Sequence, residues 1–206
     1  MYVPKPFEMS QPDEISAFIR ANNFGILVSQ GESGPLATHL PFYYDAPESA
    51  LLGHMAKANP QWKNLASQEV LAIFQGPHAY ISPSWYQIPK SVPTWDYVAV
   101  HVYGRCSLVL DDDGMRDMLD KLVRFHEPDS ALPDQSGETF YRNMMKEIVG
   151  FQIRITNIQG ASKLSQNKPI AVQERVAMHL RQVGDAGSVG VAENIERFVQ
   201  TKRPQA

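Results

Sequence analysis

Apolar residues occupy every second position in the stretch Tyr97–Leu110. The positions of one parity are apolar or Gly, namely Val98, Val100, Val102, Gly104, Cys106, Leu108 and Leu110. The first half of the other parity carries Ala99, His101, Tyr103 and Arg105. Because side chains of a strand alternate between its two faces, this pattern predicts a long, half-buried β-strand.

Shorter apolar runs separated by turn-forming residues predict further strands. These runs are Phe24–Ser29, Leu36–Tyr44, Leu51–Met55, Val70–Phe74 and Phe151–Ile158. Gly31–Pro35 separates the first two and indicates a hairpin. Most consecutive strands lack the intervening helix of a doubly wound α/β fold. The pattern therefore predicts an α+β fold built on an antiparallel barrel, which also leaves no free edge strand.

Helical periodicity appears between and after these strands. Helices are predicted after Ser10 and Asn59-Pro60, after Asp111–Asp113, over Glu138–Val149, and at Ala171–Val183 and Val191–Thr201. Ser10 and Asn59 are suitable N-caps, and Pro60 suits a first helical position. The last two helices are amphipathic and separated by a Gly-rich turn, so the chain is expected to end in a helical tail.

The stretch Phe74–Tyr97 breaks the periodic pattern. It reads FQGPHAYISPSWYQIPKSVPTWDY and contains several Pro, Trp and Tyr residues. Because Pro is excluded from helix interiors and central strands, we expect an ordered, aromatic-rich loop. Such loops often carry binding groups on a rigid scaffold, so this one is expected to cover a flat, partly polar ligand.

The amino-acid composition is that of a globular protein and gives no sign of a membrane or nucleic-acid-binding class. The 206 residues are 43% hydrophobic and 20% charged, as in an ordinary globular chain, and the net charge of −3 gives no general attraction to nucleic acid. No apolar run approaches the roughly 18 residues of a membrane span, and the N-terminus lacks a signal-peptide core. Cys106 is the only cysteine, which fits a reducing compartment. A soluble, cytoplasmic protein without a membrane partner is expected.

Several long and unusual words occur along the first 167 residues. They are MYVPKPF at the start, HLP at His39–Pro41, GHMAKANPQW at Gly53–Trp62, FQGPHAYISPSWY at Phe74–Tyr86, VPTWDY at Val92–Tyr97, IVGFQIRIT at Ile148–Thr156 and KLSQN at Lys163–Asn167. On these words the chain resembles the PaiB-like proteins, described as FMN-binding negative transcriptional regulators with the FMN-binding split-barrel fold. The loop Gln87–Ser91 is shorter than is usual in that family.

The resemblance implies a homodimer with two FMN sites at the subunit interface. It places an FMN-binding split-barrel domain at residues 1–167, and residues 168–206 are then a C-terminal helical tail packed on the barrel. The family's link to proteases and sporulation does not itself establish contact with DNA.

The first candidate group would hold the FMN phosphate. It consists of His54, Lys57 and Asn59, of which Lys57 offers the point charge that suits a phosphate. The alternatives are a solvated Lys57 and an Asn59 that only caps a helix.

The second candidate group would face the isoalloxazine and ribityl chain. Tyr80, Trp85 and Trp95 are candidates for an aromatic wall, and Gln75, His78, Ser82 and Thr94 for hydrogen bonds. The alternative is that the Trp residues fill the core or a dimer interface.

The third candidate group, Lys163, Ser165, Gln166 and Asn167, follows a strand and would reach the partner's flavin in a split-barrel dimer. The alternative is a solvent-exposed turn with a helix cap.

Other chemistry finds less support. The six His residues form no HExxH or His-x-His pair, so no metal site is predicted, although haem ligation by one His remains an alternative to FMN. Cys106 alternates with core valines and is expected to be a buried, inert thiol.

Three functions fit the sequence. The first is a flavin-binding or redox-linked regulator. The second is an FMN-dependent oxidoreductase using NAD(P)H or another small redox partner, with His78, Tyr80 or His101 as proton donor. The third is a repressor that contacts DNA through the tail, whose Arg175, Arg181, Arg197, Lys202 and Arg203 are diluted by Glu193 and Glu196.

Overall fold

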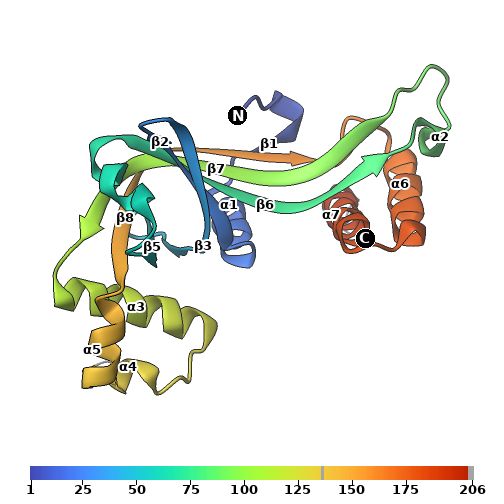
Figure 1. Cartoon of the computed structure of the whole chain (residues 1–206). Helices are drawn as coiled ribbons and strands as arrows, with labels where there is room; N and C mark the ends of the chain where they lie inside the picture. Colours follow the sequence, from blue (N-terminus) through green and yellow to red (C-terminus); the bar gives the residue numbers. More distant parts are fainter. Residues whose placement is uncertain (136, 204–206) are drawn as a thin grey trace. The chain divides into compact units, whose positions relative to one another are not determined.

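The computed structural model describes residues 1–135 and 137–203 (Figure 1). Residues 204–206 of the predicted tail lie outside the described residues. The chain divides into two compact units. Unit 1 holds Met1–Ile15, Gln75–Val100 and the described residues from Gln159 onward, and unit 2 holds Ser16–Phe74 and His101–Ile158.

Strands and helices follow one another in an irregular order. The strands are β1 (Glu8–Met9), β2 (Phe24–Gly31), β3 (Gly34–Pro41), β4 (Tyr43–Asp45), β5 (Ala50–Ala56), β6 (Glu69–Ile81), β7 (Thr94–Val109) and β8 (Ile148–Lys163). The helices are the 3-10 helices η1 (Lys5–Phe7) and η2 (Pro60–Ser67), and the α-helices α1 (Pro12–Ala21), α2 (Pro83–Tyr86), α3 (Asp112–His126), α4 (Leu132–Gln135), α5 (Thr139–Met145), α6 (Ile170–Val183) and α7 (Ala186–Lys202).

The strands form one sheet in the order β3-β2-β6-β7-β8-β5-β4, with β1 added beside β8. β2 and β3 form the predicted hairpin, with Phe24 opposite Pro41 and Gly31 opposite Gly34. β5 pairs antiparallel with β8, from Ala50 opposite Arg154 to Ala56 opposite Ile148. The antiparallel α+β class predicted from the sequence is confirmed.

The core of unit 2 is aromatic and aliphatic. Phe42 meets the rings of Phe74 and Phe151 edge to face, at centroid distances of 5.3 and 6.2 Å. All three side chains are fully buried. On β7, the predicted apolar parity is buried at Val98, Val100 and Val102, which confirms the alternation.

Helix α3 covers a second cluster in unit 2. Its Met115, Met118 and Leu122 pack with Leu52 of β5. Leu110 was predicted to share the buried parity of β7, but it is 79% exposed. The reason is that β7 ends at Val109, so Leu110 belongs to the turn into α3, where Asp111 caps the helix by accepting from the Gly114 amide.

In unit 1, α6 and α7 pack side by side and form a helical hairpin (Figure 1). The turn is shorter than predicted, because Gly187 and Gly190 lie inside α7. A β-carbon at Gly187 would approach the His78 carbonyl oxygen to 2.6 Å, and one at Gly190 would approach Pro77 to 2.7 Å. The Gly residues therefore allow α7 to lie directly against β6.

The bounds predicted for the loop, Phe74–Tyr97, were wrong at both ends. β6 continues through Pro77 to Ile81, and β7 begins at Thr94. The paired register of β6 with β2 ends at Ile73, so the missing Pro77 amide removes no hydrogen bond from that ladder. Only the part between the two strands is loop, and it contains the short helix α2.

The predicted helix Glu138–Val149 was too long. α5 ends at Met145, and β8 begins at Ile148, which pairs with Ala56 of β5. Ile148 and Val149 are β-branched and complete a strand that already has a partner, so pairing outweighs their helical spacing. Within residues 1–135 and 137–203, no helix is both long and apolar enough to span a membrane.

Candidate functional site

In unit 2, Lys57 directly follows the end of β5. Its backbone amide donates to the Glu147 carbonyl at 2.8 Å, and its Nζ donates to the Lys146 carbonyl at 3.4 Å. Trp62 of η2 donates its indole Nε1–H to the Lys57 carbonyl at 2.9 Å. The backbone of Lys57 is thus fixed from two sides, while its charged end meets only a carbonyl oxygen among the described residues.

Asn59 caps η2, as the helix-cap alternative predicted. Its Oδ1 accepts from the Gln61 amide at 3.0 Å, and its Nδ2 donates to Thr38 Oγ1 at 2.9 Å. Gln61 is 1% exposed, hydrogen bonds to Thr38, and donates to the Leu27 carbonyl and to Ser29 Oγ. This buried Gln61 network was not predicted from the sequence, where its one signal is a Gln directly after the capping pair Asn59-Pro60.

His54 lies on β5, opposite Gly150 of β8. Its buried Nδ1 has no hydrogen-bond partner among the described residues. Burial lowers the pKa of His54 below its ordinary value, so the imidazole is held neutral at neutral pH. A neutral, unpartnered ring nitrogen is available as a hydrogen-bonding atom but not as a cation for a phosphate.

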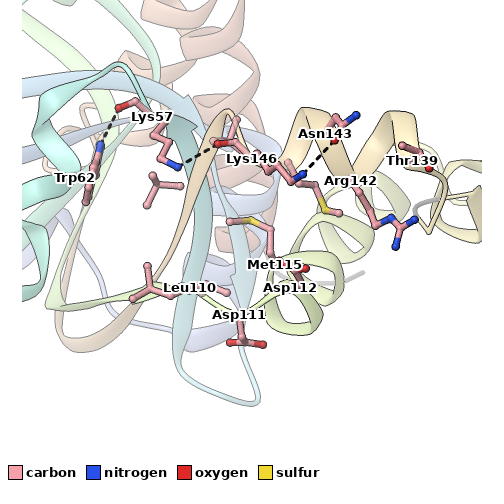
Figure 2. A pocket seen from close by; sticks show the side chains of 14 residues that line it. Lys57, Trp62, Leu110, Asp111, Asp112, Met115, Thr139, Arg142, Asn143 and Lys146 are labelled. Carbon is pink, nitrogen blue, oxygen red and sulfur yellow. Dashed lines mark hydrogen bonds between the residues drawn. The ribbon is translucent and has the colours of Figure 1, made fainter.

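A cavity of about 500 Å³ lies in unit 2 beside Lys57 (Figure 2). Lys57, Arg142 and Lys146 contribute cationic side chains to its lining. Asp111 and Asp112 contribute carboxylates, and the remaining lining includes Trp62, Met115 and Ile148. Only Lys57 of these residues was a predicted site residue. Arg142 and Lys146 were not predicted, because charged residues in a helical segment are usually solvent-exposed and do not by themselves indicate a binding site.

In unit 1, three aromatic residues from β6 and β7 come together. Trp95 lies 6.2 Å from His78 and 6.1 Å from Tyr80, measured between ring centroids. Tyr80 and Trp95 are 48% and 55% exposed. Gln75 donates its side-chain amide to His78 Nδ1 at 3.2 Å. Four of the predicted ring-binding residues therefore form one partly exposed group.

Trp85 and Ser82 do not join that group in the structure. Trp85 of α2 stacks on His179 of α6, with centroids 5.3 Å apart and ring planes at 14°. Ser82 caps α2 by accepting from the Ser84 amide at 3.3 Å. Arg175 of α6 also donates to the Tyr86 carbonyl at 2.8 Å. Trp85 thus packs α2 onto α6, in line with the filler alternative for this residue.

The segment Lys163–Asn167 is bound to the start of β7. Lys163 Nζ donates to Thr94 Oγ1 and to the Trp95 carbonyl, and it lies 3.6 Å from Asp96 Oδ1. Ser165, which has a left-handed backbone at φ 58°, donates its hydroxyl to Asp96 Oδ2 at 2.6 Å. This segment is therefore not the plain exposed turn of the alternative interpretation.

Gln166 closes the same segment on itself. Its Oε1 accepts from the Leu164 amide at 2.6 Å, and its Nε2 donates to the Ser162 carbonyl. The polar ends of Lys163, Ser165 and Gln166 are therefore engaged within unit 1.

Asp96 of unit 1 was not predicted as a site residue. Its side chain is fully buried, and burial raises its pKa above the ordinary carboxyl value, partly countered by Ser165 and Lys163. The signal was present, because Asp96 shares the parity of the buried Val98, Val100 and Val102. A lone acid in an inward-facing row indicates a buried ionic partner.

The predicted site residues thus fall into two groups, one in each unit. His54, Lys57 and Asn59 belong to unit 2, together with the candidate proton donor His101, and the other predicted cofactor-binding residues belong to unit 1. A family model described as "Putative FMN-binding domain" matches residues 1–157, which is more than half of the chain.

The chain belongs to this FMN-binding family.

Curated relatives agree with the assignment to the FMN-binding family. The chain is 37% identical over 201 residues to "Protease synthase and sporulation protein PAI 2" of Bacillus subtilis, covering 95% of this chain and 97% of the relative. It is 30% identical to an uncharacterized protein of Emericella nidulans, covering 91% and 93% of the two chains. The predicted membership in the PaiB-like proteins is confirmed, and FMN is the cofactor that the family assignment supports.

Solved structures agree on the fold. The chain matches the flavocytochrome Anf3 from Azotobacter vinelandii with a TM-score of 0.62, at 14% identity, over 76% of this chain and 69% of that chain. It matches the FAD and haem binding protein from Mycobacterium smegmatis with a TM-score of 0.61, at 14% identity, over 76% and 73%. At this identity the likeness establishes the fold alone, and it confirms the predicted split-barrel class.

Proposed function

We propose that this protein is an FMN-binding split-barrel homodimer that works as a flavin-linked negative regulator. The observation that carries the proposal is the match of the FMN-binding family over residues 1–157, together with the 37% identity to PAI 2. The regulatory part rests on the PaiB-like family alone. We also propose the division into a split-barrel domain at residues 1–167 and a helical tail at 168–206, and a cytoplasmic location.

The described side chains suit FMN. Lys57 offers a positive charge whose Nζ meets, in the part of the chain that the structure describes, only a carbonyl oxygen, which fits a phosphate ligand. Tyr80, Trp95 and His78 offer an exposed aromatic group that fits a flat ring system. Bound FMN would supply reversible redox chemistry through its ring. The chain's own residues would orient the ring, cover its faces from water and hold the phosphate.

Cofactor identity is the direct test. We expect purified protein to carry FMN or to bind added FMN, with quenched flavin fluorescence and a raised melting temperature. Cofactor released by denaturation would be identified by chromatography and mass. A colourless protein whose melting temperature does not respond to FMN would contradict the proposal, and released haem would favour the haem alternative.

A second candidate function is an FMN-dependent oxidoreductase. It is supported by the partly exposed His78 and Tyr80, which bear groups able to transfer a proton beside Trp95. Oxidation of NAD(P)H by the FMN-loaded protein, compared with free FMN at equal concentration, tests this function. Turnover no faster than with free FMN would exclude it for these donors.

DNA remains a candidate partner of the regulator. Three Arg residues of the tail already have partners in unit 1, since Arg181 pairs with Glu196, Arg203 with Glu174, and Arg175 with the Tyr86 carbonyl. The two ion pairs neutralise Arg181 and Arg203, so less of the tail's positive charge is left for phosphate contacts. Gel shifts on the protein's own promoter at increasing salt test the idea, because true phosphate contacts weaken as salt rises.

A further inference from the structure

The cavity in unit 2 is lined by three cations to which the described residues offer no carboxylate partner. Among the described side chains, Arg142 has no hydrogen-bond or ion-pair partner. Lys57 Nζ donates only to the Lys146 carbonyl at 3.4 Å, and Lys146 Nζ donates to the neutral Asn143 Oδ1 at 3.2 Å. Figure 2 shows these contacts along one wall of the cavity.

Some other basic residues in the described part of the chain do have acidic partners. Lys121 lies 3.0 Å from Asp117 and 3.6 Å from Asp45, and Arg181 lies 2.6 Å from Glu196. The cavity does contain carboxylates, but Asp111 Oδ1 already accepts from the Gly114 amide as the cap of α3. The lining thus carries three cations and two carboxylates, an excess of positive charge that favours a bound anion.

The rest of the lining suits a ligand with an apolar or aromatic body. Trp62 borders the cavity, and its indole N–H is held by the Lys57 carbonyl at 2.9 Å, which fixes the ring. Met115, Met145 and Ile148 complete the apolar part. A volume of about 500 Å³ is within the range of small-molecule sites.

We propose that Arg142 and Lys146 of the α5 segment, together with Lys57, bind a phosphate monoester in this cavity. Arg binds phosphate through a planar fork of donors, and Lys acts as a point charge, so the set suits a doubly charged group. The phosphate monoester could come from two sources. The first is FMN itself, and for this source the inference rests on the proposed FMN function. The other source is a separate phosphorylated small molecule.

Paired titrations with FMN and riboflavin isolate the phosphate, since riboflavin lacks it. We expect Arg142→Gln to weaken FMN binding by about tenfold or more, the usual worth of a charged hydrogen bond, and to leave riboflavin binding unchanged. Lys146→Gln is expected to act in the same direction. Arg105→Gln, which removes an exposed Arg outside the cavity lining, is the matched control. Circular dichroism melts check that each variant is folded.

A second experiment, a titration with inorganic phosphate, tests the cavity without flavin. If the phosphate belongs to a separate molecule, phosphate should raise the melting temperature of the wild-type protein and of Arg105→Gln, but not of Arg142→Gln, while the ratio of FMN to riboflavin affinity stays equal in all three. The proposal is overturned if Arg142→Gln changes neither that ratio nor the response to phosphate. A wild-type protein that binds neither flavin would contradict the FMN function alone, and the phosphate titration would still decide this inference.

Discussion

The side chain of Asp96 is fully buried, and two neighbouring residues stabilise its negative charge. Lys163 and Ser165 are its partners, and Lys163 also hydrogen bonds to Thr94 and the Trp95 carbonyl. Lys163→Met keeps an aliphatic side chain but leaves the carboxylate without its cation. We expect the free energy of unfolding to fall by about 3 kcal/mol at neutral pH, because an uncompensated buried charge is costly. Urea denaturation would measure the loss.

The loss in Lys163→Met should depend on pH. Burial raises the pKa of Asp96 above the unfolded-state value of about 4, so the native state binds this proton more tightly than the unfolded state. Stability from this group is therefore greatest at low pH and falls as pH rises through the native pKa. Removing Lys163 raises that pKa further, so the destabilisation should shrink in acid. Equal losses at acidic and neutral pH would exclude the ion pair as their source, and the Asp96→Asn, Lys163→Met double variant should recover part of the stability.

Cys106 is expected to be chemically inert in the native protein. It is 6% exposed, and burial raises the pKa of its thiol to about 12. Since the thiolate is the reactive form, thiol reagents at pH 8 should label the native protein very slowly. Complete labelling should follow unfolding in denaturant. Rapid labelling of the native protein would mean that β7 opens locally at this position.

At the scale of elements, the contact of α7 with β6 is sensitive to a single methyl group. A β-carbon at Gly187 would lie 2.6 Å from the His78 carbonyl oxygen. Ala normally favours a helix over Gly by about 1 kcal/mol, so an uncrowded Gly187→Ala would be stabilising. We expect the opposite, a loss of about 1–3 kcal/mol from overpacking. Gly137→Ala, where a β-carbon meets nothing within 4 Å, is the control for urea denaturation.

The elements that the sequence predicted well are those set by local periodicity. The alternation of Val98, Val100 and Val102 predicts their burial, because parity along a strand is a local property. The continuation of β6 through Pro77 was not predictable in this way. It depends on where the β2 ladder ends, which is a contact with a strand far away in the sequence.

The candidate site shows the same division. Motif words identified Lys57, His78, Tyr80 and Trp95 as notable residues, and the structure brings the last three together. The pairing of Lys163 with Asp96 joins distant segments, and sequence spacing contains no information about it. Parity alone would have marked Asp96 as buried but would not have named its partner.

At the scale of the whole molecule, the proposed homodimer makes the exposed aromatic residues of unit 1 informative. Tyr80 and Trp95 are large, exposed and in contact, whereas side chains of this kind are usually buried or lie at interfaces. We therefore expect Trp95→Ala to weaken both self-association and FMN binding. Analytical ultracentrifugation should find the wild-type protein near twice the chain mass of 23.1 kDa and the variant shifted toward the monomer.

The matched control for Trp95→Ala is Phe140→Ala, which removes a 65% exposed aromatic side chain from α5 in unit 2. It should leave the mass and the FMN dissociation constant unchanged, because Phe140 is not part of the aromatic group of Tyr80, Trp95 and His78 in unit 1. At a fixed FMN concentration well above the wild-type dissociation constant, bound ligand stabilises by RT ln(1 + [L]/Kd), about 2.7 kcal/mol at a hundredfold excess. The melting temperature of Trp95→Ala should therefore rise less with FMN than that of either other protein. A variant that stays dimeric and keeps the full FMN-induced rise would place both the interface and the ring site away from Trp95.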